Sequence, residues 1–191
     1  MRPLLTGLIS AGLLAPVLAQ DKSDGPANEK AQKTYKEAFQ ALHDRRTDFA
    51  LDDFKKADKQ DHGHCRACPE KMMKYGIELA DWKTAELGGE ELVAEAHGDR
   101  ETALAHYELA RVLMADGQQE HKDEIFSHAH DELTKALAAF ANFPDAVFID
   151  GEVLAQSRQD DAAKAQFAAY VKMNKKDHPD RQRALRYISR P

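Results

Sequence analysis

The chain has 191 residues, of which 31% are charged and 7% aromatic, and its formal net charge is −6 at pH 7. This mildly acidic balance argues against nucleic acid or an anionic membrane surface as the main partner. The abundance of Ala, Glu, Lys and Leu is typical of helical proteins, and the chain is long enough to bury one continuous core as a single structural domain.

Residues 1–19 have the pattern of a secretory signal peptide. A short basic start, Met1-Arg2, precedes an apolar run from Leu4 to Leu14, and Val17-Leu18-Ala19 offers small residues for cleavage. The apolar run is shorter than the roughly 20 residues that cross a bilayer. We therefore expect an exported protein, periplasmic or extracellular, with no stable membrane insertion after cleavage. An uncleaved N-terminal anchor is the alternative.

The next segment, residues 20–28, is polar, and Gly25-Pro26 favours a flexible linker there. Apolar residues then follow the period of amphipathic helices. The first predicted helix pair has stripes at Tyr35, Ala38, Phe39 and Leu42, and at Ala50, Phe54 and Ala57. A second pair is predicted from Pro69, a favoured first-turn residue. Gly88-Gly89 falls inside its second helix and costs about 2 kcal/mol relative to alanines, so we expect that helix to break or shift there.

Two further helix pairs and a last helix follow. The third pair has apolar stripes within 103–113 and 125–137, and the polar segment from Asp116 to Asp123 is predicted to be a long turn between them. The fourth pair runs from Pro144 to about Met173, with Gly151 where two helices would approach closely. A last helix starting at His178-Pro179 is expected to cover the final apolar face.

One side-chain pattern recurs after 34 positions. A small residue, a large apolar residue four later and a third residue three later occur as Ala129, Leu133 and Ala136 and return as Ala163, Phe167 and Tyr170. Over residues 29–175 this pattern resembles the tetratricopeptide repeat (TPR) family. The resemblance implies an all-α, TPR-like right-handed solenoid of about four helix pairs, closed by a capping helix within 176–191. A generic helical bundle is the alternative fold.

In TPR proteins the first helix of each unit lines a concave groove that binds extended peptides or protein segments. Carried over onto the matching helices, the resemblance implies these groove-facing side chains: Tyr35, Phe39, His43, Lys74, Glu78, Tyr107, Arg111, Met114, Phe148, Glu152 and Gln156. Aromatic rings beside mixed charges suit a peptide with apolar anchors and polar backbone groups. Packing of the aromatic members inside the core is an equally weighted alternative.

The segment His62 to Pro69 contains the only two cysteines of the chain, Cys65 and Cys68. In an exported protein the oxidising compartment favours a structural disulfide. Because the pair precedes a predicted helix, the free N–H groups of that helix could instead stabilise a thiolate and make the pair redox-active. Together with His62 and His64, the cysteines would also provide the ligand types that zinc prefers. The sequence leaves these three roles open.

No other part of the sequence indicates a catalytic or metal-binding site. His121, His128 and His130 are expected to be solvated surface side chains, because His128 and His130 point to different faces of a helix. The sequence contains no nucleophile elbow, no phosphate-binding glycine loop and no H-E-x-x-H motif. We therefore expect no catalytic residues and no cofactor.

Three phrases carry a narrower resemblance: 105–110, 143–146 and 184–191. They are similar to exported bacterial proteins in which a TPR segment precedes a thioredoxin-like (redoxin) domain, and no such domain lies within these 191 residues. The resemblance implies a thioredoxin-like partner. The expected function is thus an exported, non-enzymatic scaffold that binds a protein or peptide. The alternative is the docking part of a thiol–disulfide oxidoreductase system with a redox-active or metal-binding Cys65/Cys68 pair.

Overall fold

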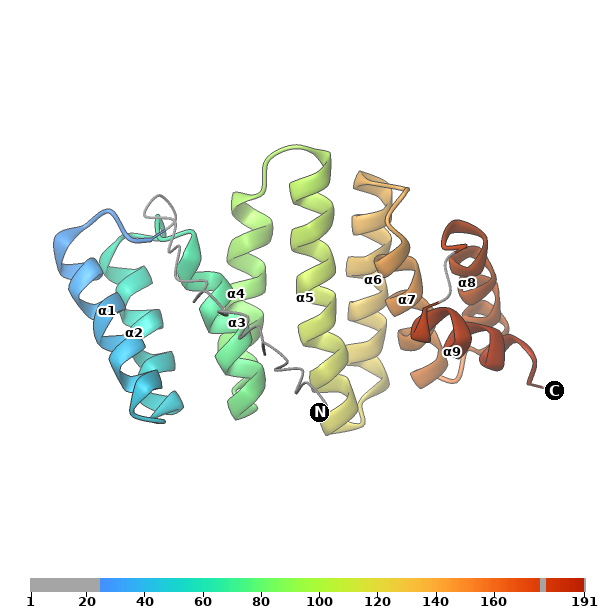
Figure 1. Cartoon of the computed structure of the whole chain (residues 1–191), viewed down its shortest axis with the longest axis horizontal. Coiled ribbons are helices and arrows are strands. Elements are labelled where there is room, and N and C mark those ends of the chain that lie inside the picture. The colour runs from blue at the N-terminus through green and yellow to red at the C-terminus, as the bar shows by residue number, and fades with distance from the viewer. Residues whose placement is uncertain (1–24, 176–177, 191) are drawn as a thin grey trace, which may run out of the picture.

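The computed structural model describes residues 25–175 and 178–190, so the predicted signal peptide at 1–19 lies outside the described residues. Within these ranges all regular secondary structure is helical (Figure 1). The helices are α1 (Glu29–His43), α2 (Thr47–Gln60), α3 (Ala67–Leu79), α4 (Trp82–Glu95), α5 (Asp99–Glu120), α6 (Asp123–Ala139), α7 (Pro144–Gln156), α8 (Asp160–Met173) and α9 (Pro179–Ile188). In the described part of the chain, no helix is both long and apolar enough to span a membrane.

The helices stack in chain order as successive pairs. α1 packs with α2, α3 with α4, α5 with α6 and α7 with α8, and each pair packs against the next. Figure 1 shows them side by side in one row, with α9 lying across α8 at the end. The predicted all-α, TPR-like stack of helix pairs with a C-terminal capping helix is therefore confirmed.

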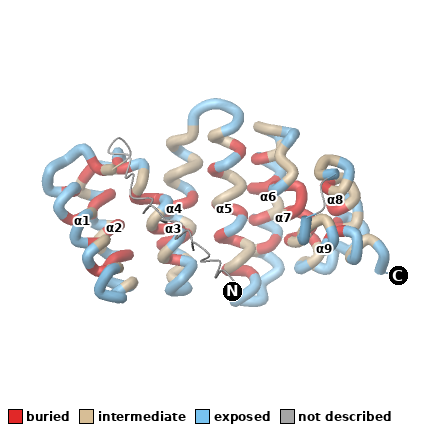
Figure 2. Tube along the Cα trace, in the orientation of Figure 1, coloured by how far each residue is buried: buried red, intermediate tan, exposed pale blue. Residues whose placement is uncertain are grey.

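The predicted small–large–small stripes form the core between the helices. Ala50, Phe54 and Ala57 of α2 are completely buried, and the corresponding residues of α6, Ala129, Leu133 and Ala136, are also 0% exposed. Buried segments accordingly recur along the helices of the stack (Figure 2). Because each unit buries its apolar stripe against its neighbours, the fold depends on stacking rather than on a single central core.

Contrary to the sequence prediction, α4 runs unbroken through Gly88-Gly89. The reason is close packing on both sides of the helix. A Cβ at position 88 would lie 2.6 Å from the carbonyl oxygen of Pro69, and one at position 89 would lie 2.7 Å from Cδ1 of Leu109. The two glycines let α4 approach α3 and α5, and this packing offsets their low helix propensity.

The polar segment from Asp116 to Asp123 was wrongly predicted to be a long turn. α5 continues through it to Glu120 and is capped by His121 in the left-handed conformation, at φ 55°. Asp116 and Gly117 are buried, and a Cβ on Gly117 would lie 3.0 Å from the ring of Phe126. The additional residues therefore lengthen the helix and its contact with α6.

Candidate functional site

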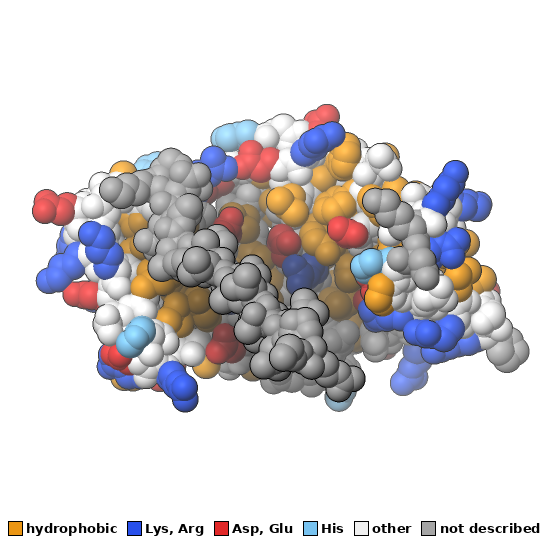
Figure 3. Space-filling view, in the orientation of Figure 1, with side chains coloured by type: hydrophobic (Ala, Val, Ile, Leu, Met, Phe, Trp, Pro, Cys, Tyr) orange, Lys and Arg blue, Asp and Glu red, His pale blue; other side chains and the backbone are white. Residues whose placement is uncertain are grey.

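A cavity of about 490 Å³ lies between α7, α8 and α9. Its lining residues are Phe148, Glu152, Ala155, Gln156, Asp160, Phe167, Arg183, Arg186, Tyr187 and Arg190. Three of the predicted groove residues, Phe148, Glu152 and Gln156, are among them. The residues of α9 were predicted only as a cap, yet they form one wall of the cavity. Figure 3 shows Lys and Arg side chains gathered over the end of the molecule that α8 and α9 occupy.

Aromatic rings form the floor of the cavity. Phe148 and Phe167 are only 5% and 4% exposed, and their ring centroids lie 5.6 Å apart. Tyr187 of α9 packs on Phe167 with a centroid separation of 5.0 Å. Because the phenylalanine rings are occupied by packing, the surface open to a ligand consists mainly of polar and charged side chains.

Both carboxylates of the cavity have partners. Arg183 pairs with Glu152 and also lies 5.2 Å above the ring centroid of Phe148. Burial raises the pKa of Glu152, and the charge of Arg183 opposes that effect. The hydroxyl of Tyr187 donates to Oδ1 of Asp160 at 2.6 Å, and burial together with this bond raises the pKa of Tyr187 to about 12.

Two arginines of the cavity are not paired in this way. Among the described residues, Arg186 and Arg190 have no carboxylate partner. The guanidinium of Arg190 lies 4.7 Å from the ring centroid of Tyr187, and the backbone carbonyl of Arg190 accepts a hydrogen bond from Nζ of Lys164. The cavity therefore presents positive charge that no described acidic group neutralises.

The predicted groove residues of α1 and α3 lie away from this cavity. Tyr35 and Phe39 pack edge-to-face against Phe54, with centroid separations of 5.3 and 5.4 Å. His43 and Lys74 are exposed, and Glu78, also exposed, accepts a 3.4 Å hydrogen bond from Thr47.

The predicted groove residues of α5 also lie outside the cavity. Tyr107 packs on Phe143 with a centroid separation of 4.9 Å, and Arg111 lies over the Tyr107 ring while pairing with Glu108 at 2.9 Å. Met114 packs against the core cluster shared by α5, α6 and α7. The structure thus brings together the three predicted residues of α7 with α9, and the other eight line no part of this cavity.

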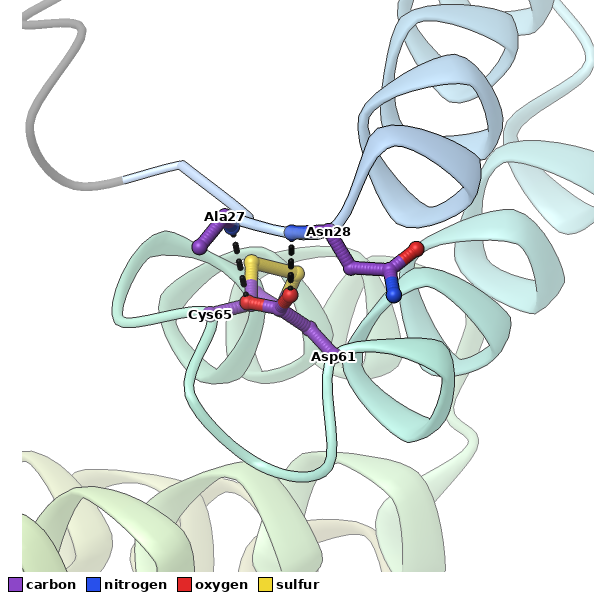
Figure 4. The surroundings of a disulfide bond; sticks show 5 residues. Ala27, Asn28, Asp61 and Cys65 are labelled. Atoms are coloured by element: carbon purple, nitrogen blue, oxygen red, sulfur yellow. Dashed lines mark hydrogen bonds between the residues drawn. A yellow bond between two sulfur atoms is a disulfide. The ribbon is translucent and has the colours of Figure 1, made fainter.

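The structure joins Cys65 and Cys68 in a disulfide, with Cα atoms 5.3 Å apart and both residues fully buried. Beside it, the carboxylate of Asp61 accepts hydrogen bonds from the backbone N–H groups of Ala27 at 3.0 Å and Asn28 at 2.6 Å (Figure 4). Ala27 and Asn28 belong to the segment predicted as a linker. The loop between α2 and α3 therefore holds the start of α1.

Burial of this disulfide bears on the alternative roles of the pair. Since neither sulfur is exposed, the folded chain presents no sulfur for direct attack by an external thiolate. His62 and His64 are exposed, and within the described residues no three His, Cys, Asp or Glu side chains are placed to hold a metal ion. The geometry thus offers no support for a redox-active or metal-binding role.

Several buried carboxylates were not predicted from the sequence. Among the described residues, Oδ1 of Asp58 on α2, Oε2 of Glu91 on α4 and Oδ1 of Asp116 on α5 are buried without a hydrogen-bond partner. Burial, followed by the charges of Asp58, Glu95 and Glu90, raises the pKa of Glu91 to about 7. The pKa of Asp58 is raised as well, chiefly by burial and then by Glu95 and Asp61.

Two buried carboxylates of the later units, Glu132 and Asp150, have partners. Glu132 lies 2.6 Å from Nδ1 of His106 and accepts from Lys135 at 2.7 Å. Asp150, 1% exposed, lies 2.5 Å from Nδ1 of His130 and accepts from Gln166. His130 is therefore not the solvated side chain that was predicted. Lys135 follows Glu132 by one turn of α6. The other partners lie 16 to 26 residues from their carboxylates in the sequence, so no short motif could have predicted these pairs.

Comparisons with known proteins identify no family for this chain. No model of a known protein family matches the chain, and no curated protein matches it. Among solved structures, a crystal structure of a thermophilic TPR protein from Thermus thermophilus is similar, with 19% identity, a TM-score of 0.34, and coverage of 83% of this chain and 98% of that chain. The helix pairs described above make the fold of this chain TPR-like.

Proposed function

We propose that this chain is an exported, non-catalytic scaffold that binds a segment of a partner protein in the cavity between α7, α8 and α9. Export rests on the signal-peptide pattern of residues 1–19, and the compartment would be periplasmic or extracellular. A fold of stacked helix pairs supports a protein partner, because such stacks present extended surfaces to other chains.

The observation that carries this proposal is the cavity itself. It has a volume of about 490 Å³ and gathers Phe148, Glu152 and Gln156 with residues of α9. A cavity of this size at the junction of three helices can seat a few side chains of a partner segment. Glu152, Arg183 and Asp160 in its walls, already held by ion pairs and hydrogen bonds, would contact that segment without being reordered.

A random-peptide library displayed on phage tests the proposal. Selection on the wild-type protein is expected to enrich related peptides, and these should bind the purified protein in solution. Replacing Gln156 with Trp would fill the cavity from an exposed position on α7. We expect the variant to weaken binding of the selected peptides about tenfold or more, since a bulky side chain in a small site blocks its ligand.

The matched control is Gln118→Trp, which places the same side chain at an exposed helical position of α5 outside the cavity. This variant should bind the selected peptides as the wild type does. The proposal fails if no peptide is enriched, or if both tryptophan variants bind the enriched peptides with wild-type affinity.

A further inference from the structure

One face of α9 and Arg190, just beyond the end of the helix, present an arginine stripe to the cavity. Arg183, Arg186 and Arg190 all line it, spaced so that they follow one side of the helix and its end. Arg183 is engaged by Glu152 and by Asp180, whose Oδ1 lies 3.3 Å from Nη1. Arg186 and Arg190 lack a carboxylate partner among the described residues. Lys164 of α8 adds a further cation next to Arg190.

The C-terminal residues that carry the arginine stripe are net positive, whereas the chain as a whole is acidic. The chain as a whole carries a net charge of −6. Its last residues, 174–191, carry six basic side chains, Lys175, Lys176, Arg181, Arg183, Arg186 and Arg190, against Asp177 and Asp180. These last residues are therefore net positive in a chain that is acidic overall, and three of their arginines line the cavity.

Carboxylates of the described chain compensate only part of the arginine stripe. Like charges three or four positions apart on a helix are unfavourable by about 0.2–0.5 kcal/mol per pair. α9 has only 10 residues, and such a short helix depends on its packing against α8. Ion pairs with Glu152 and Asp180 compensate Arg183 alone, so Arg186 and Arg190 are available to a ligand.

The walls of the cavity decide which kind of ligand fits. Because Phe148 and Phe167 are almost fully buried, the cavity offers little open apolar surface to an apolar anchor. Glu152 is paired with Arg183, and Oδ1 of Asp160 accepts the hydroxyl of Tyr187, so both carboxylates already interact with groups of the chain. The charged groups that remain without a carboxylate partner among the described residues are the guanidiniums of Arg186 and Arg190, and a guanidinium matches a carboxylate in bidentate geometry.

We propose that Arg186 and Arg190 bind carboxylate side chains of the partner, so that the cavity takes an acidic protein segment rich in Asp or Glu. This proposal rests on the proposed function and names the chemistry of its ligand. A nucleic acid is the less favoured polyanion, because the acidic remainder of the chain would repel its long phosphate backbone, whereas a short acidic segment meets only the net-positive C-terminal residues.

Peptides from the library selection provide the test, with fluorescence anisotropy as the readout. The enriched sequences should carry an excess of Asp and Glu. Converting these residues to Asn and Gln should raise the Kd about tenfold or more, and added salt should weaken binding of the acidic form. The double variant R186Q/R190Q should lose the same factor, whereas R186K/R190K, which keeps the charge, should retain part of the affinity.

The control K30Q/K36Q removes two exposed positive charges from α1 at the opposite end of the stack, and it should bind like the wild type. Circular dichroism would verify that each variant is folded. Enriched peptides that are sensitive to Gln156→Trp but carry no acidic excess would overturn this inference and leave the proposed function standing. The inference is likewise overturned if the amide forms bind as well as the acidic forms, or if a labelled oligodeoxythymidylate binds more tightly than the acidic peptides. Selection of no peptide at all would overturn the proposed function and this inference with it.

Discussion

Replacing Glu91 with Gln would remove a partly buried negative charge on α4 that the carboxylate of Asp58 on α2 repels. Oε2 of Glu91 has no hydrogen-bond partner, and Asp58, Glu95 and Glu90 surround it with like charge. The folded-state pKa of about 7 exceeds the ordinary value of 4.5, so the folded chain holds this proton more tightly than the unfolded chain. The resulting stabilisation is fully present below about pH 4.5 and is lost as the pH rises through about 7.

The size of the expected change in the free energy of unfolding follows from the shift of the Glu91 pKa. Moving the pKa of Glu91 from 4.5 to about 7 corresponds to about 3 kcal/mol of free energy if the charge were unscreened. Glu91 is only partly buried, so screening by water reduces the expected effect to about 1 kcal/mol. Glu91→Gln should therefore raise the free energy of unfolding by about 1 kcal/mol at about pH 8 and change it little at about pH 5.

Urea denaturation followed by far-UV circular dichroism, at several pH values and constant ionic strength, measures this effect. Glu132→Gln is the matched control, because Glu132 and Glu91 occupy equivalent positions in their helix pairs. Each lies the same number of residues after a buried glycine of the preceding helix, Gly117 for Glu132 and Gly76 for Glu91. Burial acts to raise the pKa of Glu132, but hydrogen bonds from Lys135 and His106 outweigh it and the pKa is lowered. The control should lose about 2 kcal/mol at neutral pH, with a smaller loss in acid.

The two variants should thus change stability in opposite directions at neutral pH. If Glu91→Gln is destabilising at about pH 8, or if it leaves the pH dependence of unfolding unchanged, then Glu91 is not a buried, unpartnered charge. The reasoning about the repulsion of Glu91 by Asp58 would then be refuted.

Two further changes test the packing of the second helix pair. Reducing the Cys65–Cys68 disulfide, which closes a sequence separation of 3, should lower the free energy of unfolding by about 2 kcal/mol and speed amide exchange at Ala27 and Asn28; a C65A/C68A variant should show no response to the reductant. Gly88→Ala should lower the free energy of unfolding by about 1–3 kcal/mol in urea titrations, because the new Cβ would lie 2.6 Å from the Pro69 carbonyl oxygen. A rise of about 1 kcal/mol, as helix propensity alone predicts, would contradict the close packing of α3 and α4.

The helix pairs could be predicted from the sequence because their information is local. The stripe Ala50, Phe54 and Ala57 has the helical period, and burying it needs only the neighbouring helices. The two errors in the fold arose where tertiary contacts override local preference. Gly88-Gly89 is a weak helix former that close packing requires, and the polar run after Asp116 continues α5 because Gly117 packs on Phe126.

Less of the candidate site than of the fold could be predicted from the sequence. Glu152 and Gln156 were placed by the repeat register, which assigns them to the first helix of the fourth unit. The arginines of α9 were missed because the last helix was predicted only as a cover for the apolar face, and no motif marks Arg186 or Arg190 as unpaired. The electrostatic repulsion between Asp58 and Glu91 acts between residues of different units, and side-chain spacing carries no information about it.

Binding of a selected peptide to three forms of the protein tests the central claim most directly. Anisotropy titrations of the wild type, Gln156→Trp and Gln118→Trp with the same labelled peptide compare a filled cavity with an equally bulky change elsewhere. A binding scaffold that uses the cavity between α7, α8 and α9 should lose about tenfold or more in affinity with Gln156→Trp alone. Equal affinity of all three forms would show that the peptide binds elsewhere and would contradict the account.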